Sequence, residues 1–136
     1  MHATAAARAT FVDHSLDTAS PSRLLVLLYD RLYLDLARGE QAMRAGDRPL
    51  AHGQLVHAQE IVGALMDSLD GSWTGAEQLS SIYQYLLTEL MGANVAGDAD
   101  RVAACRDIVE PLRETWREAA ATAASEAPRA FVGQTA

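Results

Sequence analysis

Residues 17–36 read DTASPSRLLVLLYDRLYLDL, and this stretch decides the fold. Ser20 followed by Pro21 is typical of a helix start, because serine caps the first turn and proline fits its first position. On a helix, one apolar face about 120° wide, which is a normal core face, would contain Leu24, Leu25, Leu28, Leu32, Leu36 and Met43. Leu27 and Leu34 fall on the opposite side. This helix therefore carries more apolar surface than its core face needs, and we interpret the excess as a partner surface.

Apolar residues recur every three or four positions along the rest of the chain, which predicts further helices. The expected helices cover residues 21–45, 48–69, 76–96 and 99–124. Since the connections are only a few residues long, neighbouring helices must run antiparallel. The predicted fold is all-α, an up-down-up-down four-helix bundle. It comprises a flexible arm over residues 1–16, the bundle over 17–124 and a frayed tail over 125–136.

Glycine and small polar residues set the expected helix boundaries, as terminators and as caps respectively. The expected terminators are Gly46, Gly71 and Gly97, and the expected caps are Asp47, Asp98 and either Ser72 or Thr74. Pro111 lies inside the fourth predicted helix, where proline removes one backbone hydrogen bond. We therefore expect either a bend around residues 107–111 or a helix that restarts with Pro111.

The composition is that of a globular protein with one domain: 136 residues, 49% hydrophobic and 21% charged. The net charge of −7 speaks against binding to nucleic-acid phosphates. Cys105 is the only cysteine, which excludes an internal disulfide. The longest apolar run, residues 24–29, is too short to span a membrane, and the first residues lack a signal-peptide pattern. We expect a soluble, cytoplasmic protein with neither nucleic-acid binding nor membrane insertion.

No pattern of catalytic or metal-binding residues stands out. Metal sites in helical bundles commonly use Glu-x-x-His pairs, whereas His57 and Glu60 have the reverse order. His52 and His57 would point about 140° apart on a helix, which makes a shared metal difficult. The sequence also lacks a nucleophile elbow and a phosphate-binding glycine loop. We therefore expect no enzyme, no metal and no cofactor.

Four groups of residues, in order along the chain, match the pattern of a known family. The first group is Phe11, then Thr18, Ala19, Ser20 and Pro21, then Leu24, Leu28, Tyr29 and Asp30. The second is Ala58, Gln59, Glu60, Ile61, Val62, Leu65 and Leu69. The third is Leu79, Ile82, Tyr83, Tyr85, Leu90, Ala93 and Asn94, and the fourth is Arg113 and Trp116. With these groups, residues 11–119 resemble the FliS family of flagellin-specific export chaperones.

The resemblance implies a small antiparallel bundle that binds the C-terminal segment of flagellin in the cytoplasm. It implies that the chaperone keeps this segment from polymerising and helps to present it to the flagellar secretion apparatus. The export gate or a co-chaperone would be further partners. By the same resemblance, the arm with Phe11 would cover part of the binding site while no client is bound.

The expected partner-binding residues are Leu27, Tyr29 and Leu34 on the first helix, with Phe11 as the displaceable cover. Ile61 and Tyr85 are weaker candidates, because they lie off the central seams of their helices. Core packing is the alternative for Tyr29, Ile61 and Tyr85. The alternative for the whole protein is a homo-oligomeric bundle, in which the exposed leucines form a weak subunit interface and no flagellin binds.

Overall fold

The fold was obtained as a computed structural model, which describes residues 21–135 and the side chains of residues 22–125. The expected arm over residues 1–16, with Phe11, and the Ser20 cap lie outside the described residues. The helices are α2 (Pro21–Arg44), α3 (Arg48–Asp67), α4 (Ala76–Ala96) and α5 (Ala99–Thr135). The described residues contain no strand, which confirms the all-α prediction.

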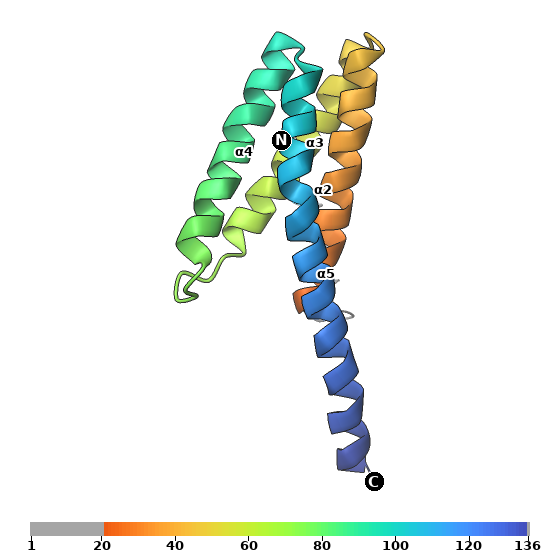
Figure 1. Ribbon diagram of the computed structural model, residues 1–136, viewed down its shortest axis with the longest axis vertical. Coiled ribbons are helices and arrows are strands. Elements are labelled where there is room, and N and C mark those ends of the chain that lie inside the picture. The colour runs from red at the N-terminus through yellow and green to blue at the C-terminus, as the bar shows by residue number, and fades with distance from the viewer. Residues whose placement is uncertain (1–20, 136) are drawn as a thin grey trace.

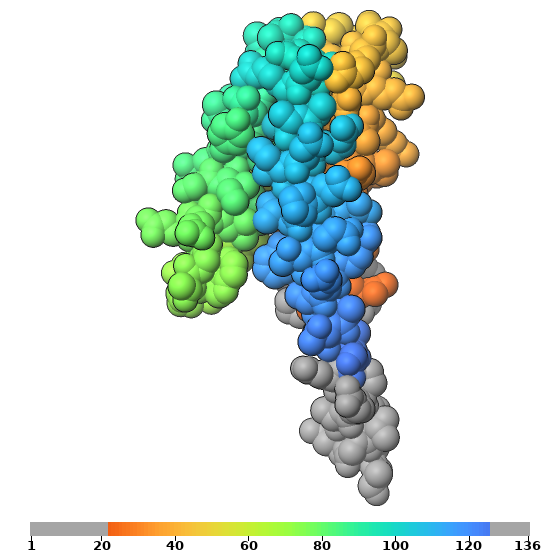
Figure 2. Space-filling model, viewed as in Figure 1, coloured from red at the N-terminus to blue at the C-terminus, as the bar shows by residue number. Residues whose placement is uncertain are grey.

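The four helices run alternately up and down (Figure 1). Each helix packs against two neighbours, in the cyclic order α2, α3, α4 and α5. Among the described residues, the backbones of the diagonal pairs α2–α4 and α3–α5 do not approach each other closely. α2 packs most extensively, against α3 and α5, whereas α4 is held less tightly. In Figure 2 the surfaces of α4 and α5 meet near one end and separate toward the α3–α4 loop.

The core lies between the helices and uses the faces that the apolar periodicity predicted. On α2 the predicted core face is buried at Leu24, Leu28, Leu32, Leu36 and Met43, and Leu25 packs against it. The other helices contribute Leu55, Val62 and Leu65 from α3, Tyr83, Leu86 and Leu90 from α4, and Val102, Cys105 and Val109 from α5. Among the described helices, none is long and apolar enough to cross a membrane.

Several predicted caps are confirmed. Gly46 and Gly97 adopt positive φ angles of 78° and 69° at the ends of α2 and α4. The carboxylate of Asp47 accepts a hydrogen bond from the Leu50 amide at 3.2 Å, which caps α3. Asp98 accepts from two amides in the first turn of α5. Short polar side chains and glycine thus end and start the helices as the sequence indicates.

The connection between α3 and α4 differs from the prediction. α3 ends at Asp67, before Gly71, where the Ser68 hydroxyl donates to the Leu65 carbonyl at 2.8 Å. Neither Ser72 nor Thr74 caps α4, because the N-cap is Gly75, without a side-chain hydrogen bond. The amide and hydroxyl of Ser72 instead donate to the Asp70 carboxylate and form a local turn.

α5 is longer and more continuous than expected. It runs without a break through Pro111, so the predicted restart is wrong, and a bend remains the other alternative. Proline has no backbone N–H, so Pro111 leaves the carbonyl four residues earlier without its helical hydrogen bond. Because Pro111 is exposed, that carbonyl can bond water instead. The helix also continues past residue 124 to Thr135, beyond the end of the other three helices (Figure 1). Residues 119–124 are rich in alanine, the best helix former, which favours this continuation.

Candidate functional site

One face of α2 is exposed along its length. Its residues follow one another at spacings of four, three, four, three and four positions: Leu27, Arg31, Leu34, Arg38, Gln41 and Ala45, all exposed. We call them the α2 stripe. Residues at this spacing lie in one row on a helix. Leu27 and Leu34 are 40% and 37% exposed, so the prediction that they lie outside the core is confirmed.

Beneath the α2 stripe, a buried carboxylate joins α2 to α3. Asp35 is completely buried, and its Oδ1 accepts a hydrogen bond from Arg31 Nε at 2.9 Å. The other oxygen is hydrogen-bonded to Nδ1 of His57 on α3. A buried carboxylate needs such partners, because burial without them is costly. This network fixes the Arg31 guanidinium on the stripe, where the Arg31 side chain is still 49% exposed.

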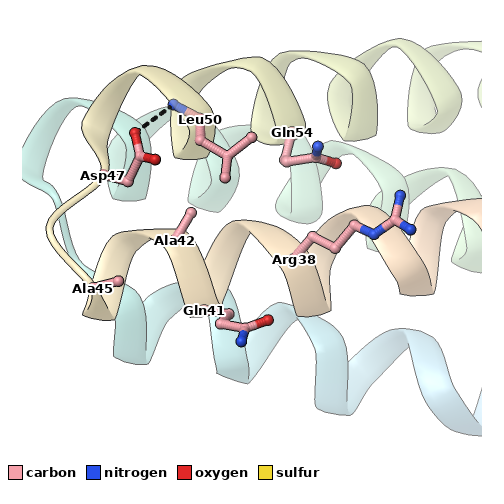
Figure 3. A pocket seen from close by; sticks show the side chains of 7 residues that line it. All are labelled: Arg38, Gln41, Ala42, Ala45, Asp47, Leu50 and Gln54. Atoms are coloured by element: carbon pink, nitrogen blue, oxygen red, sulfur yellow. Dashed lines mark hydrogen bonds between the residues drawn. The ribbon is translucent and has the colours of Figure 1, made fainter.

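A hollow of ≈ 470 Å³ opens at the end of the α2 stripe, between the last turns of α2 and the first turns of α3. Figure 3 shows Arg38 and Gln41 of α2 at this hollow, with Leu50 and Gln54 of α3. Leu50 is half exposed. Gln54 Oε1 is buried and has no hydrogen-bond partner among the described residues. The hollow thus offers apolar surface, and the Gln54 oxygen is buried out of reach of solvent.

Tyr29 and Ile61 lie in the core, which is the alternative that the sequence left open for both. Tyr29 is completely buried, and its hydroxyl lies 2.5 Å from the hydroxyl of Tyr83 on α4. Burial raises the pKa of both tyrosines. Ile61 is only 5% exposed. A partner has no access to these two side chains in this structure, which corrects the expectation that they form part of the surface.

Tyr85 is exposed, but it does not join the α2 stripe. Its exposed fraction is 53%, and it lies on α4, diagonally across the bundle from α2. Met91 and Val95, at 55% and 86%, are further exposed apolar residues of α4. Both lie off the buried face of this helix, which passes through Tyr83, Leu86 and Leu90. The predicted residues therefore form two separate surfaces, one on α2 and one on α4.

Aromatic side chains connect the α3–α4 loop to α5. The rings of Trp73 and Trp116 lie 6.4 Å apart, and Trp116 lies 6.4 Å from Tyr29. Trp73 is 49% exposed. A Cβ atom on Gly75 would approach the Trp73 ring to 2.7 Å, so glycine leaves room for this side chain. The role of Trp73 was not foreseen, because the contact joins two segments that are distant in sequence.

The described side chains include metal-ligating residue types and one cysteine thiol. Among them, no group of three or more His, Cys, Asp or Glu residues could hold a metal ion. Cys105 is buried, and burial raises the pKa of its thiol to about 11. This thiol is therefore protonated and unreactive near neutral pH.

Four antiparallel helices, with leucines and arginines exposed in one row on α2, place this chain among the all-α helical bundles. Over residues 3–123 the chain matches the family described as Flagellar protein FliS, and it belongs to this family.

Three relatives are named Flagellar secretion chaperone FliS. That of Bacillus subtilis is 25% identical over 109 residues, which cover 80% of this chain and 82% of the relative. The Salmonella typhimurium protein is 27% identical over 79% of this chain and 82% of its own. The Vibrio cholerae protein is 25% identical over 77% of this chain and 79% of its own. Family membership supports a chaperone role in flagellar export, in a family that is non-enzymatic.

Proposed function

We propose that this protein binds the C-terminal segment of flagellin in the cytoplasm and keeps it from polymerising until the segment reaches the flagellar secretion apparatus. The observation that carries the proposal is the pair of exposed leucines on α2, Leu27 and Leu34, in a chain of the FliS family. A folded monomer has no need for leucines in a row on its surface, whereas a protein that binds an apolar client does.

The physical basis is the folding of a disordered segment on an apolar surface. Such a segment loses conformational freedom when it becomes an amphipathic helix. Burial of apolar surface compensates this loss with about 25 cal/mol for each Å² removed from water. Since α2 and α4 lie diagonally across the bundle, separated by α3 and α5, a client that reached both Leu34 and Tyr85 would have to pass around the bundle. An extended client can do this, and a compact one cannot.

The proposed binding residues are therefore Leu27 and Leu34 on α2, with Tyr85 on α4 as a second point of contact. Phe11 remains part of the proposal as a cover that the client displaces. If the arm competes with the client, removal of residues 1–16 would increase the affinity, because binding would no longer have to displace it. The export gate or a co-chaperone would bind the complex elsewhere.

The proposal is tested with a variant that carries Leu27→Asp and Leu34→Asp. Two carboxylates in the apolar contact should weaken binding of a peptide from the C-terminal segment of flagellin by at least about tenfold, as measured by isothermal titration calorimetry. Circular dichroism should show unchanged helix content, because both side chains are exposed.

Val95→Asp is the matched control, since Val95 is 86% exposed on α4. This variant should bind the peptide as the unmodified protein does. Equal affinities for the double variant and the control would contradict the proposed site. An unmodified protein that fails to bind the peptide would contradict the proposed function. In that case, light scattering that shows a stable dimer, lost in the double variant, would favour the homo-oligomeric alternative.

A further inference from the structure

The α2 stripe carries positive charge in a chain whose net charge is −7. Arg31 and Arg38 alternate with Leu27 and Leu34, and all four side chains are exposed. The two arginines are seven residues apart, which places them about 10 Å from each other along the helix axis. A row in which leucines alternate with arginines can distinguish partners by charge. A row of leucines alone could not do so.

Nearby carboxylates leave much of this charge unbalanced. Asp35 bonds Arg31 but is completely buried, below the surface that a partner would touch. The Glu40 carboxylate accepts hydrogen bonds from Arg44 and Arg106, which lie outside the α2 stripe. Among the described residues, Arg38 has no hydrogen-bond or ion-pair partner.

The remaining carboxylate at the hollow belongs to Asp47, and it caps α3 through the Leu50 amide. Arg38 extends beside the hollow, where Gln54 Oε1 also lacks a partner (Figure 3). One end of the α2 stripe thus combines the Arg38 guanidinium, which has no partner among the described residues, with the half-exposed side chain of Leu50.

We infer that the α2 stripe binds an amphipathic helix whose apolar side chains alternate with two acidic residues seven positions apart. The inference rests on the proposed function in one respect, namely that this helix belongs to the exported client. Two helices that pack at a small crossing angle meet in rows with this repeat. Leucines of the partner would then contact Leu27 and Leu34, and its carboxylates would reach Arg31 and Arg38.

Opposite charge on the partner follows from the positions of the arginines. A lysine on the partner would face Arg38, whose charge no described side chain neutralises. A glutamate there forms a charge-assisted hydrogen bond in a contact from which apolar neighbours exclude water. The surface therefore selects by charge as well as by hydrophobicity.

The test uses three synthetic helical peptides that differ at two positions only. All carry leucines at alternating spacings of three and four residues, and the two variable positions, seven residues apart, are both Glu, both Gln or both Lys. Calorimetry with the unmodified protein should give the highest affinity for the Glu peptide. The Gln peptide should bind about fivefold more weakly, and the Lys peptide more weakly still.

Arg38→Glu should invert this order. Its affinity for the Glu peptide should fall about tenfold, and its affinity for the Lys peptide should rise above that of the unmodified protein. Arg38 is preferred to Arg31 for this variant, because Arg31 supports the buried Asp35. Gln84→Glu is the control: it adds a negative charge at an exposed position on α4 and should leave the order unchanged.

An unchanged order in Arg38→Glu, or equal affinities for the three peptides, would overturn the inference. Measurements with a flagellin peptide distinguish failure of this inference from failure of the proposed function. A flagellin peptide that binds with the same affinity to Arg38→Glu and to the unmodified protein would overturn the inference and leave the function intact. Failure of the flagellin peptide to bind, together with inversion for the synthetic peptides, would overturn the function and support the charge selectivity of the surface.

Discussion

At the scale of single residues, the most consequential contact is the pair of buried hydroxyl groups of Tyr29 and Tyr83. It joins α2 to α4, two helices that lie diagonally across the bundle and whose backbones do not approach each other closely. A tyrosine in the core is tolerated when its hydroxyl finds a partner, because an unpaired buried hydroxyl loses its hydrogen bond to water. This pairing explains why a residue that flanks the core face of α2 is completely buried rather than available to a client.

Tyr29→Phe should destabilise the protein by about 1–2 kcal/mol, because the Tyr83 hydroxyl would remain buried without a partner. Urea unfolding followed by circular dichroism measures the change. The double variant Tyr29→Phe with Tyr83→Phe should lose less than the sum of the two single changes, since it leaves no unpaired hydroxyl. Tyr85→Phe is the matched control and should be neutral, because Tyr85 is 53% exposed. Additive effects in the double variant would argue against the hydroxyl pair.

At the scale of the elements, the helices end where glycine permits a left-handed residue. Gly46 and Gly97 share this conformation, but their surroundings differ. No atom lies near a Cβ position on Gly46, whereas a Cβ on Gly97 would collide with the Arg48 guanidinium. That guanidinium donates to the Asn94 carbonyl at 2.8 Å and connects the start of α3 to the end of α4.

Gly46→Ala should cost about 1–2 kcal/mol, which is the strain of a left-handed conformation with a Cβ atom. Gly97→Ala should cost more, because the flexible Arg48 side chain would have to move away from its hydrogen bond with the Asn94 carbonyl. Denaturant unfolding of both variants compares the two effects directly. If Gly97→Ala with Arg48→Ala costs no more than Gly46→Ala, the additional loss belongs to the Arg48 contact. Equal costs for the two single variants would show that this contact contributes nothing.

At the scale of the whole molecule, the bundle is unevenly packed. α2 packs closely against α3 and α5, and α4 is attached less extensively to α3 and α5. In Figure 1, α4 diverges from α5 toward the α3–α4 loop. Trp73 and Trp116 lie in contact where the loop faces α5. A helix with fewer contacts opens at a lower free energy than its neighbours.

Hydrogen exchange should therefore rank the helices. Amides of Leu32 and Leu36 on α2 should exchange most slowly, and those of Leu86 and Leu90 on α4 should exchange about tenfold or more faster. All four side chains are completely buried, so solvent exposure alone would predict equal protection. NMR measurements of native-state exchange supply the rates. Equal protection in α2 and α4 would mean that the bundle opens only as one cooperative unit.

The sequence by itself determined the four helices, most of their boundaries and the exposure of Leu27 and Leu34. These features depend on local physics: apolar periodicity, capping by Asp47 and Asp98, and the conformational freedom of Gly46 and Gly97. The missed cap of α4 has a local cause as well, because Asp70 recruits Ser72 into a different turn.

Only the tertiary structure decided which side chains near the core faces are buried and which surfaces are continuous. Tyr29 is buried because a hydroxyl from α4, 54 residues away in sequence, lies beside it. Asp35 is tolerated in the interior because His57, 22 residues away, reaches it from α3. Periodicity along one helix carries no information about such partners. Likewise, the separation of Tyr85 from the α2 stripe follows from the diagonal placement of α2 and α4, which emerges only when the helices pack together.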